Sequence, residues 1–427
     1  MTRLTALLLA LAFAPDWPTW RGPNRNDIVS EPSGWSSGGW PLKDPVWTTT
    51  VGVGGTSPVV VGGRLYTMGW DKDQVQVRCL DAASGKELWT ASYPSPAYGR
   101  HHIGDEKSYS GPTATPELDP ATGYLYTLGP DGDLHCWDTR KAGARVWHVN
   151  LYDAYHVEQR PHVGAEQRDY GFITSPLIQG DWLLVHVGAP EGAVLALSKK
   201  TGKRTWTSEC KDPAGHAGGM TPLRVEGVPC LAVLTLRNLL VLRLDAGHEG
   251  KTAALYPWTT DFGNNIATPA ALESDVLITS EYNHKAICRV HVTLTGAAKV
   301  WEKPYSSKVC SPVIYKDHVY LAWQKVRCLD YATGEQKWEG GDFGDAGSCI
   351  VTADGKLIVF GGTGRVSLVE TAEFSADRYT ELAKTLRIFS AIAWPHVVLS
   401  DGRLYCKDRN GNLHCYVVRD AKAPRPK

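Results

Sequence analysis

Two long stretches of the sequence carry most of the side chains that could do chemistry. YPSPAYGRHHIGDEKSYSG begins at Tyr93, NLYDAYHVEQRPHVGAEQRDYGF begins at Asn150, and both are dense in His, Arg, Tyr and carboxylate groups. Long polar segments of this kind typically form binding loops on a rigid scaffold. The residues that we predict to contact a ligand or partner here are Arg100, His101, His102, Asp105, Tyr109, His156, Arg160, His162, Arg168 and Asp169.

Shorter polar segments further along the chain add to this set. The further predicted binding residues are His216, Asn264, Asn265 and Lys308. If all these segments meet at one place, they form a polar pocket suited to a small ligand or a peptide. Simpler interpretations stay open, because a pair such as His101 and His102 can form a solvated turn, and paired asparagines can satisfy turn backbone.

No sequence pattern identifies a catalytic group or a metal site. His156 and His162 lie 6 residues apart in an expected loop, which is a weak signal for a metal-binding pair. The sequence has no CxxC motif and no adjacent cysteines. His135, His148 and His414 fall within expected strands, and we interpret them as packing or rim residues. We therefore predict no catalytic and no metal-binding residue.

The composition limits the class of protein. The 427 residues contain 45 Lys and Arg and 45 Asp and Glu, so charge gives no reason to expect nucleic acid or an anionic membrane as a partner. The 43 Gly and 16 Trp are typical of short strands joined by tight turns. Residues 1–14 combine Arg3 with an apolar run and small residues, which predicts a signal peptide. No later stretch is long enough to span a membrane, so we expect an exported, soluble protein, periplasmic or secreted.

The elements that must position the polar segments follow from a repeat. VRCLDAASGKELW (Val77–Trp89) returns as VRCLDYATGEQKW (Val326–Trp338), and a small residue followed by Pro opens an apolar run at intervals of 37 to 60 residues. Counting two degenerate copies, the chain contains eight such units, each of the size of a propeller blade. Cys79 and Cys328 occupy the same place in their units, too far apart for a disulfide, so we interpret the cysteines as small buried side chains.

The sequence of each unit predicts four short antiparallel strands with a Trp at a fixed position. In the first unit these are Pro58–Val61, Arg64–Gly69, Gln74–Leu80 and Leu88–Ser92. A buried Trp removes about 150–250 Å² from water, or about 4–6 kcal/mol as an upper bound, so such residues can dock one blade on the next. The predicted docking residues are Trp47, Trp89, Trp147, Trp206, Trp258, Trp301 and Trp338.

The last unit lacks a fourth strand, and an orphan strand precedes the first. We predict that Pro45–Val51 completes the last blade and so closes the ring without a free edge. The expected fold is an all-β, eight-bladed β-propeller of four-stranded antiparallel blades over residues 45–418. An N-terminal arm (15–44) precedes it and a basic tail (419–427) follows. A seven-bladed WD40 ring is disfavoured, because the copies lack the G-H and W-D signature.

The repeat resembles that of the PQQ-like, quinoprotein-type propeller family. DWPTWRGPNRND (Asp16–Asp27), YPWTTDFGNNIATP (Tyr256–Pro269) and ADGKLIVFGGTGRVSLVE (Ala353–Glu370) are similar to segments of exported, BamB-like, PQQ-binding-like propellers. Together the resemblance covers residues 16–418. It is specific for the fold, whereas function has to be argued from the site.

The resemblance implies two functional classes. Quinoprotein dehydrogenases hold PQQ over Ca²⁺ with an adjacent-cysteine disulfide and an Asp base, and this chain has no adjacent cysteines. BamB-like members are non-enzymatic scaffolds, and no Cys precedes Cys79, so we expect no lipid anchor. We predict a non-catalytic binding or scaffold propeller, without an assured cofactor, for a protein segment or a small polar ligand. The alternative is a PQQ- or metal-dependent alcohol or sugar oxidoreductase with PQQ and Ca²⁺.

Overall fold

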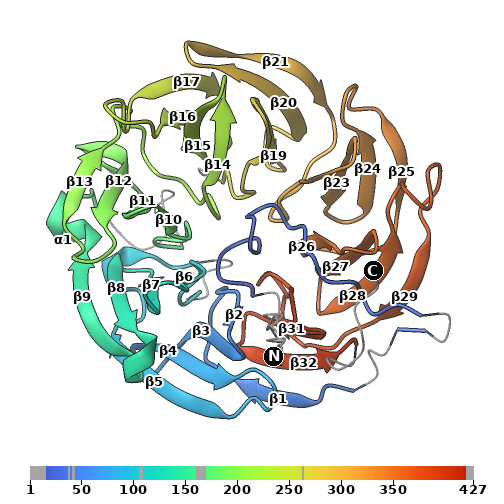
Figure 1. Ribbon diagram of the computed structural model, residues 1–427, viewed down its shortest axis with the longest axis horizontal. Coiled ribbons are helices and arrows are strands. Elements are labelled where there is room, and N and C mark those ends of the chain that lie inside the picture. The colour runs from blue at the N-terminus through green and yellow to red at the C-terminus, as the bar shows by residue number, and fades with distance from the viewer. Residues whose placement is uncertain are drawn as a thin grey trace, which may run out of the picture.

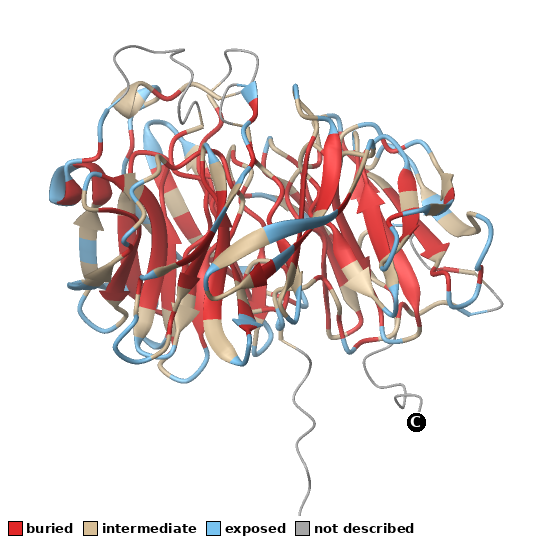
Figure 2. Cartoon of the chain, turned by 90° about the horizontal axis from the view of Figure 1, so that it is seen from above, coloured by how far each residue is buried: buried red, intermediate tan, exposed pale blue. Residues whose placement is uncertain are grey.

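The computed structural model describes residues 16–36, 39–40, 44–104, 109–159, 170–261 and 264–419. The described strands form eight four-stranded antiparallel sheets, arranged as blades around a common centre (Figure 1). The expected eight-bladed propeller is therefore confirmed. In edge-on view, buried residues fill the strands and exposed residues gather in the connections (Figure 2).

The first four blades follow the chain in order. Blade 1 contains β2 (Val59–Val61), β3 (Arg64–Asp71), β4 (Gln74–Asp81) and β5 (Glu87–Pro94). Blade 2 contains β6 (Glu117–Asp119), β7 (Tyr124–Leu128), β8 (Asp133–Asp138) and β9 (Ala144–Asn150). Blade 3 contains β10 (Leu177–Gln179), β11 (Trp182–Ala189), β12 (Gly192–Ser198) and β13 (Arg204–Thr207). Blade 4 contains β14 (Thr221–Val225), β15 (Val228–Leu234), β16 (Asn238–Arg243) and β17 (Thr252–Pro257).

The remaining blades complete the ring. Blade 5 contains β18 (Ala270–Leu272), β19 (Asp275–Ser280), β20 (Ala286–Thr293) and β21 (Gly296–Lys303). Blade 6 contains β22 (Val313–Tyr315), β23 (His318–Ala322), β24 (Val326–Asp330) and β25 (Gln336–Gly340). Blade 7 contains β26 (Ala346–Val351), β27 (Lys356–Gly361), β28 (Arg365–Glu370) and β29 (Glu381–Thr385). Blade 8 contains β30 (Val398–Ser400), β31 (Arg403–Lys407), β32 (Asn412–Val417) and β1 (Trp47–Thr50). Short helices are α1 (Leu151–Tyr155), η1 (Gly99–His101) and η3 (Thr139–Lys141).

The ring closes as the orphan strand predicted. β1 pairs antiparallel with β32, and Trp47 lies opposite Cys415. The N-terminal strand is thus the outermost strand of the blade that the C-terminal segment begins, so this blade has its full set of four strands. This shared blade ties the two ends of the propeller together.

Tryptophans join neighbouring blades through a shared acceptor. Trp47 Nε1 donates to the carbonyl of Ala82 in the next blade at 3.2 Å, and the Tyr405 hydroxyl donates to the same oxygen at 3.0 Å. Trp147 and Tyr126 repeat this arrangement on the carbonyl of Lys199, at 3.1 and 2.9 Å. A turn carbonyl that the sheet leaves unpaired is therefore satisfied twice by the preceding blade.

In several blades, the glycine of the turn before the outermost strand makes room for the indole of the preceding blade. Gly85 has φ +71°, and a Cβ built on it would lie 2.6 Å from the Trp47 ring. The turns at Gly143, Gly202 and Gly334 meet Trp89, Trp147 and Trp301 in the same way. Glycine is needed here for both its backbone conformation and its lack of a side chain.

Trp258 does not take this docking position. In blade 4 the docking position, at the register shift between β16 and β17, is occupied by Ala254, which pairs with Val241. Trp258 follows β17 and is buried, and its ring stacks on His284 with centroids 3.9 Å apart. Trp258 lies four residues beyond Ala254, after the end of the strand that carries the docking position.

The N-terminal arm crosses the centre of the ring (Figure 1). Trp17 forms a bridge with Val60 in blade 1, and the Val29 N–H donates to the Val351 carbonyl in blade 7 at 2.9 Å. The Glu31 carboxylate accepts from the Gly402 N–H in blade 8 at 2.8 Å. The segment that precedes the propeller in sequence therefore binds several of its innermost strands and lies between them.

The ten cysteines are all unpaired thiols, and nine of them are buried. Burial raises the pKa of the Cys136 thiol to about 12, so it stays protonated at neutral pH. This agrees with their interpretation as apolar side chains. Among the described residues, no helix has the length and apolar character needed to cross a membrane.

Candidate functional site

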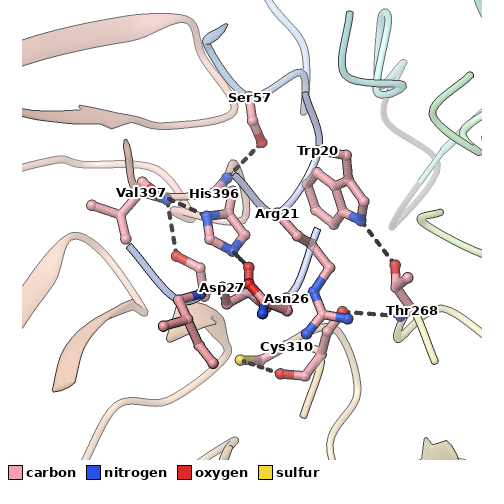
Figure 3. Close-up of polar contacts among 12 residues, drawn as sticks. Trp20, Arg21, Asn26, Asp27, Ser57, Thr268, Cys310, His396 and Val397 are labelled. Atoms are coloured by element: carbon pink, nitrogen blue, oxygen red, sulfur yellow. Dashed lines mark hydrogen bonds and ion pairs between the residues drawn. The ribbon is translucent and has the colours of Figure 1, made fainter. Parts of the chain in front are cut away.

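A buried charge cluster fixes the arm at the ring centre. Arg21 and Asp27 are each 1% exposed, and Arg21 Nε lies 2.5 Å from Asp27 Oδ2. His396 Nε2 lies 2.9 Å from the other oxygen, Asp27 Oδ1 (Figure 3). Arg21 also donates to the carbonyls of Pro269 in blade 5 and Pro312 in blade 6, at 3.2 and 2.7 Å. One guanidinium thus links the arm to two blades, and Asp27 links it to His396 at the start of blade 8.

Trp20 stands beside this cluster and lines a cavity at the centre of the ring, which we call the funnel. Its Nε1 donates to Thr268 Oγ1 at 2.9 Å, which fixes the indole (Figure 3). The other residues that line the funnel lie in connections within and between the blades, and the cavity has a volume of about 80 Å³. This is room for several waters, or for one or two side chains.

Apart from Trp20, the residues around the funnel come from two kinds of connection. Most lie between the last strand of one blade and the first strand of the next, whereas Tyr282 and Arg409 lie between the second and third strands of their blades. Because adjacent strands are antiparallel, both kinds of connection emerge on the same face. We call this the loop face. The aromatic and cationic residues of the funnel are Trp20, Tyr170, Tyr282, Trp394, His216, Lys308 and Arg409.

Two cations flank one indole at the funnel. Lys308 Nζ lies 5.8 Å and Arg409 Cζ 4.5 Å from the centre of the Trp394 ring. Both distances lie in the range of a cation–π contact. Within the described part of the chain, the buried Nε1 of Trp394 has no hydrogen-bond acceptor. No Asp or Glu is among the described residues that line the funnel.

Of the predicted binding residues, His216 and Lys308 line the funnel and Asn264 lies next to it. His216 is 1% exposed, its Nδ1 lies 2.7 Å from Asn264 Oδ1, and its ring meets Tyr170 edge-on. Asn265 is fully buried, and its Nδ2 donates to the carbonyls of Thr235 and Trp258 at 2.9 and 3.0 Å. Asn264 thus contacts a residue of the funnel, whereas Asn265 donates hydrogen bonds to backbone carbonyls of neighbouring connections.

The first long segment lies against the second on the loop face, through residues that do not line the funnel. Arg100 Nη2 lies 2.6 Å from Asp153 Oδ1, and its guanidinium stacks over Tyr152 at 5.2 Å. His102 is fully buried, with its Nδ1 2.6 Å from the Gly99 carbonyl oxygen and 3.1 Å from Asp131 Oδ1. The contacts of Arg100 and His102 hold the loops together.

The other predicted residues are dispersed. Tyr109 packs on Trp70 and His102, and burial raises its pKa above the ordinary range for tyrosine. His156 is exposed and ends α1. His101 lies in η1 and is partly exposed. Five further predicted binding residues lie outside the described residues: Asp105, Arg160, His162, Arg168 and Asp169.

Sequence reasoning missed Trp20, Trp394 and Arg409. Trp394 precedes the Pro of a degenerate repeat copy, and Arg409 lies in a short hairpin connection on the loop face. Because adjacent strands are antiparallel, the connection that contains Arg409 could have been assigned to the loop face from the sequence. Nothing in the repeat indicates Trp20, because the arm is not part of a blade.

These observations define the class: an eight-bladed propeller of PQQ-like repeats with an aromatic, cationic funnel at its centre. A family described as "Outer membrane protein assembly factor BamB" matches residues 110–340, more than half of the chain. The chain belongs to this family.

The known relatives agree with this assignment. The outer membrane protein assembly factor BamB of Burkholderia pseudomallei (strain K96243) is 24% identical over 306 residues, which are 69% of this chain and 68% of that protein. BamB from Moraxella catarrhalis has a similar structure, with a TM-score of 0.58 and 12% identity over 90% of this chain and 99% of that chain. Quinohemoprotein alcohol dehydrogenase from Comamonas testosteroni also matches, with a TM-score of 0.63 and 16% identity over 97% and 82% of the two chains. The two structural matches show the fold alone.

Proposed function

We propose that this protein is an exported, non-catalytic binding propeller that holds a segment of a partner protein in its central funnel. The segment would carry an acidic group beside an apolar or aromatic side chain. A relative that is named an outer membrane protein assembly factor favours a protein partner over a small metabolite. The size of the funnel, suited to one or two side chains, supports the same choice.

The observation that carries the proposal is the pairing of Lys308 and Arg409 around Trp394. An acidic group entering the funnel would meet two cations and the N–H of the indole. Charge-assisted hydrogen bonds of this kind are about twice as strong as neutral ones. The rings of Trp20, Tyr170 and Tyr282 would cover the apolar part of the segment.

The alternative is a quinoprotein oxidoreductase, and the funnel residues do not fit calcium-bound PQQ. Ca²⁺ takes 6–8 oxygen ligands, with carboxylates prominent among them. The described funnel residues include no carboxylate and no cysteine, and the nearby Asp345 lies 3.6 Å from Lys308 Nζ in an ion pair. A site with two cations and no acid disfavours a divalent ion, so we derive no redox step here.

Binding of two matched peptide probes tests the proposal. One fluorescein-labelled tetrapeptide contains Asp-Phe and the other Asn-Phe, and fluorescence anisotropy measures their affinity. We expect the Asp peptide to bind more tightly, and K308Q/R409Q to weaken it about 30-fold or more, since two charge-assisted bonds together contribute about 2 kcal/mol or more.

The control variant is K325Q/R327Q, which removes two cations that pair with Glu339 on the outside of blade 6. It should bind the Asp peptide like the wild type. Equal affinity for both peptides, or an equal loss in the two variants, contradicts the proposal. Reduction of a dye by the chain with PQQ, Ca²⁺ and an alcohol establishes the oxidoreductase instead.

A further inference from the structure

A second polar cluster lies in blade 2, at the loop-face end of β8 and β9. Asp133 and His135 lie two residues apart on β8, so their side chains share one face of the sheet. His148 on β9 lies directly opposite His135, and Asn150 lies opposite Asp133. The pairing of two adjacent strands therefore brings two imidazoles and a carboxylate together.

His135 is an unusual member of this cluster. It is 1% exposed, and among the described residues neither of its ring nitrogens has a hydrogen-bond partner. Its ring is held between aromatic neighbours, with centroids 4.3 Å from Tyr93 and 4.7 Å from Trp137. Burying two polar nitrogens without hydrogen bonds lowers the stability of the fold, so a residue of this kind needs an explanation.

The other blades show what this position ordinarily holds. The residue before the buried Cys is Arg78 in blade 1 and Arg327 in blade 6, and both reach glutamates near the surface. Blade 5 has Ile287 at this place, and blade 8 has His414, whose Nδ1 lies 3.4 Å from the Tyr416 hydroxyl. Of these residues, His135 is the polar one that is almost completely buried and that, among the described residues, has no hydrogen-bond partner on either ring nitrogen.

We propose that Asp133, His135 and His148 bind a divalent metal ion of the zinc class. One ligand atom from each lies within 4.8 Å of the others. Imidazole nitrogen and carboxylate oxygen are ordinary ligands of Zn²⁺, and three protein ligands leave the fourth position of a tetrahedral ion open to water. This site is separate from the funnel, and neither proposal depends on the other.

Binding requires the His148 ring to turn out of its stacked position on His135, because an imidazole nitrogen binds a metal in the plane of its ring. Ligand atoms on one tetrahedral Zn²⁺ lie about 3.3 Å apart, given Zn–N distances of about 2.0–2.1 Å, so the three must draw closer. The two imidazoles stack with centroids 4.3 Å apart, and His148, whose side chain is 36% exposed, is the ring free to turn toward the ion. The half-open side at His148 and Asp133 also provides the entry path.

Asn150 orients the carboxylate. Its Nδ2 donates to Asp133 Oδ1 at 3.1 Å, while its Oδ1 accepts from the Tyr152 and Asp153 N–H groups that begin α1. Both ends of the amide are engaged, so the Asp133 oxygen is held next to His148 Nε2 at 2.9 Å. A hydrogen-bonded outer residue of this kind is usual around a metal ligand.

Zinc titration of the tag-free, chelator-treated chain tests the site. Competition with a metallochromic indicator measures stoichiometry and affinity, and Co²⁺ in place of Zn²⁺ gives a visible spectrum that reports the ligand field. We expect one equivalent to bind, and D133N and H148N each to weaken binding at least tenfold and to lose the Co²⁺ spectrum. Both residues are partly exposed, and near-UV circular dichroism checks that the variants keep the native packing.

The matched control is H291Q. His291 is 53% exposed and pairs with Asp275 at 2.7 Å, but no third ligand completes a cluster among the described residues. This variant should bind Zn²⁺ like the wild type. A wild type that takes up no tightly bound Zn²⁺, or D133N and H148N variants that bind as well as H291Q, overturns the proposal.

Discussion

Replacing Asp27 with Asn tests how the N-terminal arm is held across the ring. The substitution keeps the size of the side chain but removes the charge that faces Arg21 and His396. Both Arg21 and Asp27 are 1% exposed, so water cannot take the place of the lost partner. Removing one member of a buried ion pair costs about 3–5 kcal/mol, because the other charge stays buried without compensation.

The loss of stability should appear first as local opening of the N-terminal arm. Two amides report on it: the Val29 N–H donates to the Val351 carbonyl at 2.9 Å, and the Val351 N–H donates to the Asp27 carbonyl at 2.8 Å. Hydrogen exchange measures the free energy of local opening. A loss of about 3–5 kcal/mol speeds exchange by about two to four orders of magnitude. Amides in the outer strands of the blades should change much less.

Two further variants complete this experiment. E339Q breaks the partly exposed ion pairs of Glu339 with Lys325 and Arg327, and should change the free energy of unfolding by at most about 1 kcal/mol. R21M/D27N should recover part of the loss, since it removes the uncompensated charge. If D27N speeds exchange at Val29 and Val351 by less than tenfold, the buried pair does not fix the arm and the reasoning fails.

Two predictions concern the propeller itself. G85A places a Cβ 2.6 Å from the Trp47 ring at a φ of +71°, so it should lower the free energy of unfolding by about 2 kcal/mol or more. The control G62A, at φ +58° with nothing within 4 Å, should lower it by about 1 kcal/mol. Equal losses of the two variants in urea denaturation would count against the docking role of the turn glycine. Burial lowers the pKa of Lys407 to about 7, below the ordinary value near 10.4 for lysine. Between pH 7 and pH 10.4, roughly these two pKa values, the unfolded chain therefore binds more protons than the folded one. The free energy of unfolding should rise with pH across this range, by up to about 1.4 kcal/mol per pH unit. The K407M variant should lack this rise, and an unchanged pH profile would show that Lys407 does not titrate there.

The blades could be predicted from sequence because each is specified locally. A turn glycine and a Trp recur at fixed spacing, and the spacing alone predicts that Trp47 completes the blade of Cys415. The same rule misplaced Trp258, since Ala254 occupies the docking position in blade 4 and Trp258 follows the strand. Local spacing determines a blade but does not determine which residue of an irregular turn meets the next one.

The funnel could be predicted only in part. His216 and Lys308 were found because they lie in connections that all face the same way. Trp20 and Arg21 were not found, because the arm has no periodic pattern and its place depends on contacts with distant blades, such as the Pro312 carbonyl. His135 was interpreted as a packing residue, and its missing partners become visible only when its neighbours are placed.

A crystal structure of the chain with the Asp-Phe peptide tests the central claim most directly. We expect the carboxylate to lie between Lys308 and Arg409, within hydrogen-bond distance of Trp394 Nε1, and the phenyl ring to point toward Trp20. A peptide bound on the outer surface of the blades, with the funnel unchanged, would contradict it.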